Sequence, residues 1–147
     1  MSIVFLKSTI FNKASVKREI GNLITKRSRL FKRERQQDML NGPHTGRLYR
    51  RRRGKGFIRS HRASAKGQRP SPDTMTLVNA VSQKRTGDLS ARVYIAEKRN
   101  PVNKMLASQY AEILQKKLGR PIITADDAAR EQKEIVRVAS DLIKRLT

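Results

Sequence analysis

The sequence predicts a single α+β domain: a small antiparallel sheet with a long protruding β-hairpin, packed by an N-terminal and a C-terminal helix. Three observations lead to this fold class. The chain has 147 residues, the usual size of one domain. Apolar residues recur at helical spacing near both ends of the chain, and shorter alternating runs lie between them. We therefore expect residues 1–147 to form one domain with a helical region at 1–44, a basic hairpin at 45–64 and a sheet-and-helix core at 65–147.

The first predicted element is an amphipathic helix over residues 12–40. Its apolar stripe consists of Val16, Ile20, Leu23, Ile24, Leu30 and Phe31. Its basic face consists of Lys17, Arg18, Lys26, Arg29, Lys32, Arg33 and Arg35. The helix is expected to end before the "NGPH" segment, because Gly and Pro do not sustain a helix. We expect the stripe to pack on the sheet that contains Val93 and Ile95.

A β-hairpin is predicted on either side of the Gly-Lys-Gly tip at residues 54–56. Short alternating runs begin at Leu48 before the tip and at Phe57 after it. The turn is longer than two residues, and the arms contain few β-branched residues. Residues 64–73 follow with two prolines and a glycine, which predicts an extended loop.

A short helix and one clear strand come next. Asp73 or Thr74 is placed to cap this helix. Its apolar residues are Leu77, Val78 and Val81. The strand is the segment "DLSARVYIAE", in which apolar and polar residues alternate. Its apolar face consists of Leu89, Ala91, Val93 and Ile95.

Two further helices complete the predicted fold. The segment "MLASQYAEILQKKLG" ends with two lysines and Gly119 before Pro121, which is typical of a helix end. Its apolar residues are Leu106, Tyr110, Ile113 and Leu114. The last helix runs from Thr124 or Ala125 to Leu146, with aspartates first and basic residues last, an order that complements the helix dipole. Its stripe consists of Ala128, Ile135, Val138, Ala139, Leu142 and Leu146.

Charge is concentrated in the first half of the chain. The formal net charge is +22, of which residues 1–70 carry +17 and residues 71–147 carry +5. This asymmetry predicts a polyanion or an acidic protein surface as a partner.

The chain has no cysteine, which excludes disulfides and thiolate sites. The N-terminal apolar run is too short to span a bilayer, so we expect a protein made in the cytoplasm with no membrane partner.

The candidate contact surface is the tip of the predicted hairpin. Its cations are Arg50, Arg51, Arg52, Arg53 and Lys55. They fit within about 20 Å of extended chain and are suited to DNA phosphates or to an acidic protein partner. A solvated tip that keeps an edge strand from pairing is the alternative explanation. Tyr49 and Phe57 are expected to pack rather than to stack on bases, so base-specific recognition is not predicted.

No catalytic or metal-binding pattern is found. His44 and His61 are the only histidines, and neither has a paired carboxylate at ligand spacing. Ser60 lies beside His61 but lacks a third triad member. Helix capping and the helix dipole account for Asp126 and Asp127. We therefore expect no enzymatic activity, no metal and no cofactor.

Five short motifs occur in a fixed order between residues 45 and 147. Their residues are Thr45, Gly46, Leu48 and Tyr49; residues 61–65, Gly67 and Pro70; Asp73, Thr74 and Leu77; Tyr110, Ala111 and Leu114; Arg120 and Pro121. The series resembles the phage tail-completion proteins, also called head-to-tail joining or neck proteins. The departures from the family pattern are Lys66 for Pro, Met75 for Gly, Gln115 for Glu and Ile122 for Phe.

The resemblance implies a structural virion protein that forms a ring of six or twelve copies in the neck of a tailed phage. The implied partners are other copies of the chain, a portal-side head-closure or adaptor protein, the tail tube or tail terminator, and genomic DNA bound without sequence preference in the lumen. The implied locations are the virion neck and, during assembly, the host cytoplasm. The assembly-interface residues expected on this basis are Tyr49, Phe57, His61, Arg62, Arg69, Pro70 and Arg120.

Two other classes of protein are weighed against this one. An RNA-binding ribosomal or nucleoprotein-type protein would share the high charge, the absence of cysteine and the basic hairpin, but not the ordered motifs. A toxin or small nuclease would need a catalytic constellation that the sequence does not show.

Overall fold

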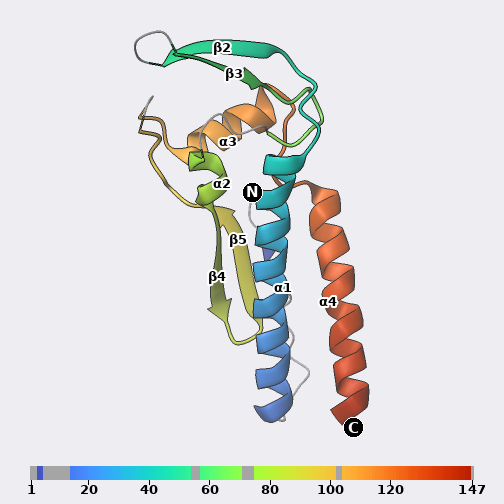
Figure 1. Cartoon of the computed structure of the whole chain (residues 1–147). Helices are drawn as coiled ribbons and strands as arrows, with labels where there is room; N and C mark the ends of the chain where they lie inside the picture. The colour runs from blue at the N-terminus through green and yellow to red at the C-terminus, as the bar shows by residue number, and fades with distance from the viewer. Residues whose placement is uncertain (1–2, 5–13, 54–56, 71–74, 102–103, 147) are drawn as a thin grey trace. The chain divides into compact units, whose positions relative to one another are not determined.

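A computed structural model of the chain describes residues 3–4, 14–53, 57–70, 75–101 and 104–146 (Figure 1). Helices and antiparallel strands occupy separate segments, so the predicted α+β class, with a long helix toward each end, is confirmed. The elements are β1 (Ile3–Val4), α1 (Ala14–Asn41), β2 (Leu48–Arg53), β3 (Phe57–Arg62), α2 (Thr76–Ala80), β4 (Val81–Gly87), β5 (Ser90–Ile95), α3 (Ala107–Lys116) and α4 (Ala125–Leu146).

The chain divides into two compact units. The first unit comprises Met1–Glu34, Ser82–Tyr94 and Ile123–Thr147, and the second comprises Arg35–Val81 and Ile95–Ile122. The helix α1 contributes residues to both units. The hairpin and the loops that carry the family-like motifs belong to the second unit.

The sheet of the first unit has the strand order β1-β5-β4. Strand β5 follows the predicted alternation, because Ala91 and Val93 are buried while Arg92 between them is exposed. Strand β4 was not predicted. Val81, which was assigned to the preceding helix, is its first residue, and most of the strand is exposed. A strand with no apolar alternation gives no sequence signal, and here hydrogen bonding to β5 defines it.

The buried face of α1 differs in part from the predicted stripe. Ile20, Ile24 and Phe31 are buried as expected, whereas Leu30 is 36% exposed. Val16 and Leu23 are only partly buried. Ser28 and Arg35 are the polar residues of the buried face. Positions 24, 28, 31 and 35 share one side of a helix, which places these two polar residues in line with the apolar ones.

Arg35 was predicted to lie on the basic face, and that prediction is wrong. The residue is 4% exposed, and its Nη2 lies 3.0 Å from Asp38 Oδ2 one turn further along the helix. The nearby acid neutralises a cation that would otherwise be costly to bury.

Gly21 brings α1 against the turn between β4 and β5. A Cβ atom at this position would meet the carbonyl oxygen of Asp88 and would lie 2.8 Å from Arg85 Nη2. The absence of a side chain is therefore what allows the helix to approach the turn so closely. A salt bridge of 2.8 Å between Lys17 Nζ and Asp88 Oδ2 adds a second contact between the same two segments.

The C-terminal helix α4 lies alongside the first part of α1 (Figure 1). It begins as predicted, with a reciprocal cap in which Asp127 Oδ2 accepts from the Thr124 amide at 2.8 Å and Thr124 Oγ1 accepts from the Asp127 amide at 3.1 Å. Glu131 is 2% exposed and binds Arg27 Nη2 of α1 at 2.7 Å. This ion pair links the two long helices.

The second unit contains α2, α3 and the hairpin. Helix α2 has Met75 as its N-cap, which makes no side-chain capping bond, and the predicted capping residues Asp73 and Thr74 lie outside the described residues. The α3 region ends as expected at Gly119, whose φ of 58° is left-handed. The buried apolar residues of this unit include Met39, Leu77, Val78, Ala80, Leu114 and Ile122.

Candidate nucleic-acid and assembly interface

The predicted hairpin is confirmed. Strands β2 and β3 pair antiparallel, from Leu48 opposite Arg62 at the base to Arg53 opposite Phe57 nearest the tip. Lys55 and the two glycines of the tip lie outside the described residues. Of the five predicted contact cations, four therefore belong to β2 and the fifth belongs to the connection between the strands.

The register of the hairpin sets like charges against each other. Arg51 stands opposite Arg59, and residues of like charge in directly opposed positions destabilise a strand pair. Residues 45–64 contain no Asp or Glu that would offset this repulsion. The hairpin therefore has one directly opposed pair of arginines and no acidic residue.

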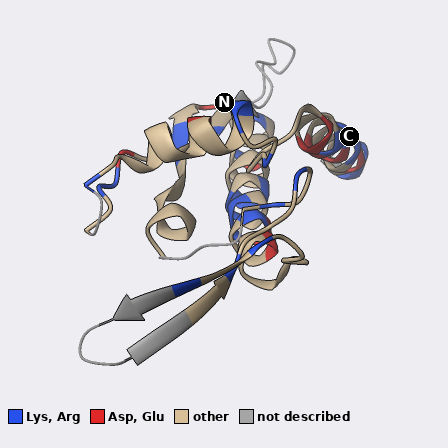
Figure 2. Ribbon diagram, turned by 90° about the horizontal axis from the view of Figure 1, so that it is seen from above, with Lys and Arg blue, Asp and Glu red and all other residues tan. Residues whose placement is uncertain are grey.

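The base of the hairpin offers accessible residues. Tyr49 is 44% exposed and stands opposite the half-buried His61. The guanidinium of Arg47 lies over the Tyr49 ring at 5.6 Å from its centroid, a cation–π contact. Within the single chain Tyr49 is therefore exposed, and the contact given for its ring is the one with Arg47. Figure 2 shows basic residues near the base of the hairpin and along α1.

The first two sequence motifs meet at this base. The Gly46 amide donates to the Ala63 carbonyl at 2.8 Å. Gln68 joins both motifs, since its Oε1 accepts from the Ala65 amide at 2.8 Å and its Nε2 donates to Thr45 Oγ1 at 2.9 Å. A Cβ atom on Gly46 would lie 2.7 Å from the Ala63 carbonyl oxygen, so glycine is needed for this close approach.

The loop after the hairpin is joined to the Arg-Pro motif before α4. Arg69 Nη1 donates to the Ile122 carbonyl at 2.6 Å and to the Pro121 carbonyl at 3.3 Å. The Gly67 amide donates to the Gly119 carbonyl at 2.7 Å. Three of the five motifs therefore form one hydrogen-bonded support for the hairpin.

The seven predicted interface residues differ in their accessibility. Tyr49 and Arg62 are exposed, and His61, Arg69 and Arg120 are half-buried. Pro70 is fully buried inside the unit, which gives it a packing role within the single chain. Phe57 belongs to β3, but its side chain lies outside the described structure.

Sequence reasoning missed a second basic surface in the first unit. It is an open groove of about 470 Å³ between α1 and β4. The sequence placed Lys26 and Arg29 on the basic face of the first helix, but nothing in it linked them to Lys84 and Arg85, which lie far along the chain from α1.

Two absences apply to the described part of the chain. It contains no group of three or more His, Cys, Asp or Glu side chains that could hold a metal ion. It also contains no helix with the length and apolarity needed to cross a membrane.

Comparisons with protein families, with curated proteins and with solved structures give no match to this chain.

Proposed function

We infer that this chain is a structural virion protein of a tailed bacteriophage and forms a ring in the neck that joins the head to the tail. In this role the ring borders the path of the genome. The proposal starts from the five ordered motifs and the family that they resemble.

The observation that carries the proposal is the hydrogen-bonded support of the hairpin. Thr45 and Gly46 bond to the loop after the hairpin, and Arg69 of that loop bonds to the carbonyls of Pro121 and Ile122. Motifs that are distant in sequence thus meet at one place and hold one structure. Such a support suits an arm that has to keep its direction while it contacts a neighbouring subunit, because a rigid arm loses less conformational entropy on docking.

The charge of the hairpin supports a position close to DNA. It has no acidic residue, it carries four consecutive arginines in β2, and its register places Arg51 opposite Arg59. Phosphate contacts of this kind hold DNA without reading its sequence, which fits a protein that must let any part of a genome pass.

The first test is the mass of the native assembly. Native mass spectrometry is expected to find a closed ring of six or twelve copies. A monomer that binds structured RNA would contradict the neck proposal and would favour the ribosomal or nucleoprotein alternative.

The second test separates the length of the hairpin from its charge. Deletion of residues 51–56 is expected to leave a folded subunit that does not join heads to tails. A control variant keeps the length and replaces the same residues with a neutral Ser-Gly sequence. Normal infectious particles from the deletion would contradict the proposal. Normal particles from the control alone would mean that assembly depends on the length of the hairpin and not on its charge.

A further inference from the structure

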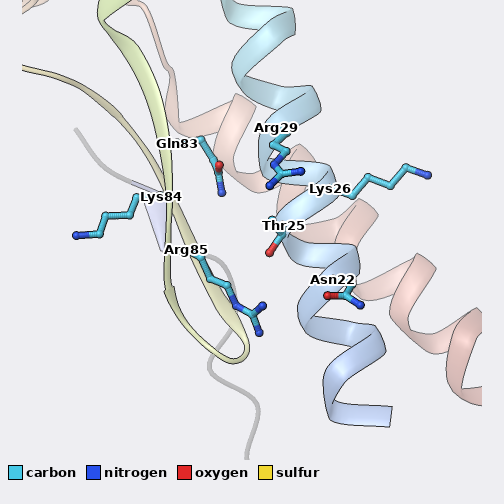
Figure 3. Close-up of a pocket in the computed structure, with 7 residues that line it drawn as sticks. All are labelled: Asn22, Thr25, Lys26, Arg29, Gln83, Lys84 and Arg85. Atoms are coloured by element: carbon cyan, nitrogen blue, oxygen red, sulfur yellow. The ribbon is translucent and has the colours of Figure 1, made fainter. Parts of the chain in front are cut away.

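A groove on the first unit has the chemistry of an anion site. Two segments form its walls, α1 and β4, and its lining residues are Asn22, Thr25, Lys26, Arg29, Gln83, Lys84 and Arg85 (Figure 3). The lining has four cations, two amides and one hydroxyl, and no carboxylate. It contains no apolar side chain, whereas sites for small organic ligands are mostly apolar.

The periodicity of a helix and of a strand places several hydrogen-bond donors of each wall on one side of that wall. Asn22, Thr25 and Arg29 recur at helical spacing on one side of α1, and Gln83 and Arg85 are two apart on one side of β4. In Figure 3, Arg29, Gln83 and Arg85 extend toward the space between the walls. Lys26 extends from α1 on the side away from β4, and Lys84 extends from β4 on the side away from α1.

Three of the four cations have no competing partner. Among the described residues Lys26, Arg29 and Lys84 make no ion pair and no side-chain hydrogen bond, and all three are exposed. Asp88, close by at the β4–β5 turn, already binds Lys17 at 2.8 Å. The positive charge of the groove is therefore not neutralised within the unit.

Arg85 has a different part in the groove. Its Nε donates to the Gly87 carbonyl and its Nη2 donates to the Asp88 carbonyl, both at 3.0 Å. It thus braces the β4–β5 turn, against which Gly21 places α1. The two walls are held at a fixed separation by packing that does not involve Lys26, Arg29 or Lys84.

We propose that this groove binds the phosphodiester backbone of a nucleic acid. Arg29 and the Gln83 amide would donate to one phosphate between the walls, and the exposed Asn22, Lys26 and Lys84 at the edges of the groove would meet the phosphates that flank it. A nucleic-acid strand is narrow enough to enter a concave groove, whereas an acidic protein would need a projecting loop to do so. The inference goes beyond the neck proposal, because it assigns a second site in the other unit and would stand if the neck proposal failed.

The experiment measures nucleic-acid binding by the full chain without interference from the hairpin. All variants therefore carry Gln in place of Arg50, Arg51, Arg52, Arg53 and Lys55. The groove variant adds Lys26→Gln, Arg29→Gln and Lys84→Gln. The matched control adds Lys133→Gln, Lys144→Gln and Arg145→Gln on α4, which removes the same charge from exposed positions of the same unit.

The readout is the slope of log affinity against log salt for a labelled duplex DNA and for a single-stranded RNA of equal length. The groove variant is expected to flatten this slope by about 2–3 on duplex DNA and by about 2 on the RNA, at roughly 0.9 and 0.7 per phosphate contact. The control is expected to leave both slopes close to their starting values. A loss on only one of the two probes would identify the nucleic acid that the groove prefers.

A second measurement keeps the test independent of any change in folding. In the hairpin-substituted chain with an intact groove, NMR is expected to show shifts of the Asn22 and Gln83 side-chain amide signals on titration with a short oligonucleotide. Equal slope losses in the groove variant and the control would overturn the proposal, since charge alone would then explain binding. Unchanged slopes and unchanged amide signals would also overturn it, and an acidic protein would become the expected occupant.

Discussion

The hairpin and the groove are both basic, but the chain builds them in different ways. The hairpin takes its cations from one continuous run, and its register sets Arg51 against Arg59. The groove takes its cations from a helix and a strand that are far apart in sequence, and it adds amides between them. The hairpin therefore concentrates charge in one continuous segment, whereas the groove combines cations and amides from two segments.

This difference implies a division of roles. A continuous run of arginines attracts any polyanion, because the attraction depends on net charge and not on the shape of the anion. A groove that is braced by Arg85 and Gly21 can select a ligand by shape, because its walls are held in place before the ligand binds. Experiments that disturb one surface and spare the other can break this comparison or sharpen it.

The largest expected effect concerns the core that supports the α1 wall of the groove. Phe31→Ala is expected to lower the free energy of unfolding by about 3–5 kcal/mol, because the ring is fully buried. Leu30→Ala, one position away and 36% exposed, is expected to change it by less than about 0.5 kcal/mol. Denaturant unfolding measures both. Equal losses would mean that α1 buries a different face from the one described.

The next effect concerns the charge of the hairpin. Replacing Arg50, Arg51, Arg52, Arg53 and Lys55 with Gln, with the groove intact, is expected to flatten the slope of log DNA affinity against log salt by about 4–5. Binding titrations over a range of salt concentrations measure this slope. An unchanged slope together with lost particle assembly would mean that the charge serves a protein partner. If neither changed, the hairpin tip would be solvated surface.

The sequence predicted the parts of the fold that repeat a local pattern. Residues 125–146 and 90–95 have clear periodicity, and the structure agrees with both elements. Arg35 was assigned to the exposed face of α1 because it is charged. Its position along the helix places it on the buried face, where Asp38 neutralises its charge. The hairpin was found because short alternating runs flank its Gly-Lys-Gly tip. The groove was not found because no local pattern reports that β4 lies beside α1.

A moderate effect is expected from the close approach of α1 to the β4–β5 turn. Gly21→Ala is expected to destabilise the protein by about 1–3 kcal/mol, because the new methyl group meets the Asp88 carbonyl oxygen. Gly87→Ala is the control, since its methyl group would meet only the Ser90 hydroxyl, at 2.8 Å. Thermal or denaturant unfolding gives both values. Alanine has a higher helix propensity than glycine by roughly 0.5–1 kcal/mol, so a more stable Gly21→Ala variant would show that the close contact does not limit the packing.

The smallest expected effect is a pH dependence of the free energy of unfolding. It distinguishes cations that form ion pairs inside the first unit from cations that are available to a ligand. Burial raises the pKa of Glu131 above its usual value of 4.5, although the Arg27 guanidinium partly opposes the shift. Glu134 has the opposite shift, because its hydrogen bond to Arg137 lowers its pKa. The two carboxyl groups lie on the same helix, one turn apart.

The sign of each contribution follows from proton linkage. For Glu131 the folded protein binds a proton more readily than the unfolded chain, so its contribution to stability improves as pH falls through the raised folded pKa toward 4.5. For Glu134 the contribution is present above pH 4.5 and is lost as pH falls through the lowered folded pKa. The other titrating groups are common to the wild-type protein and its variants, so they largely cancel in the difference between them.

The measurement is the free energy of unfolding of the wild-type protein minus that of a Gln variant, followed as pH falls. With Glu131→Gln, this difference is expected to rise between neutral pH and about pH 4.5. With Glu134→Gln, it is expected to fall below about pH 4.5. Curves of the same sign would mean that Glu131 is not held in a desolvated pair with Arg27. Arg27 would then belong with Arg29 among the cations that α1 can offer to a nucleic acid.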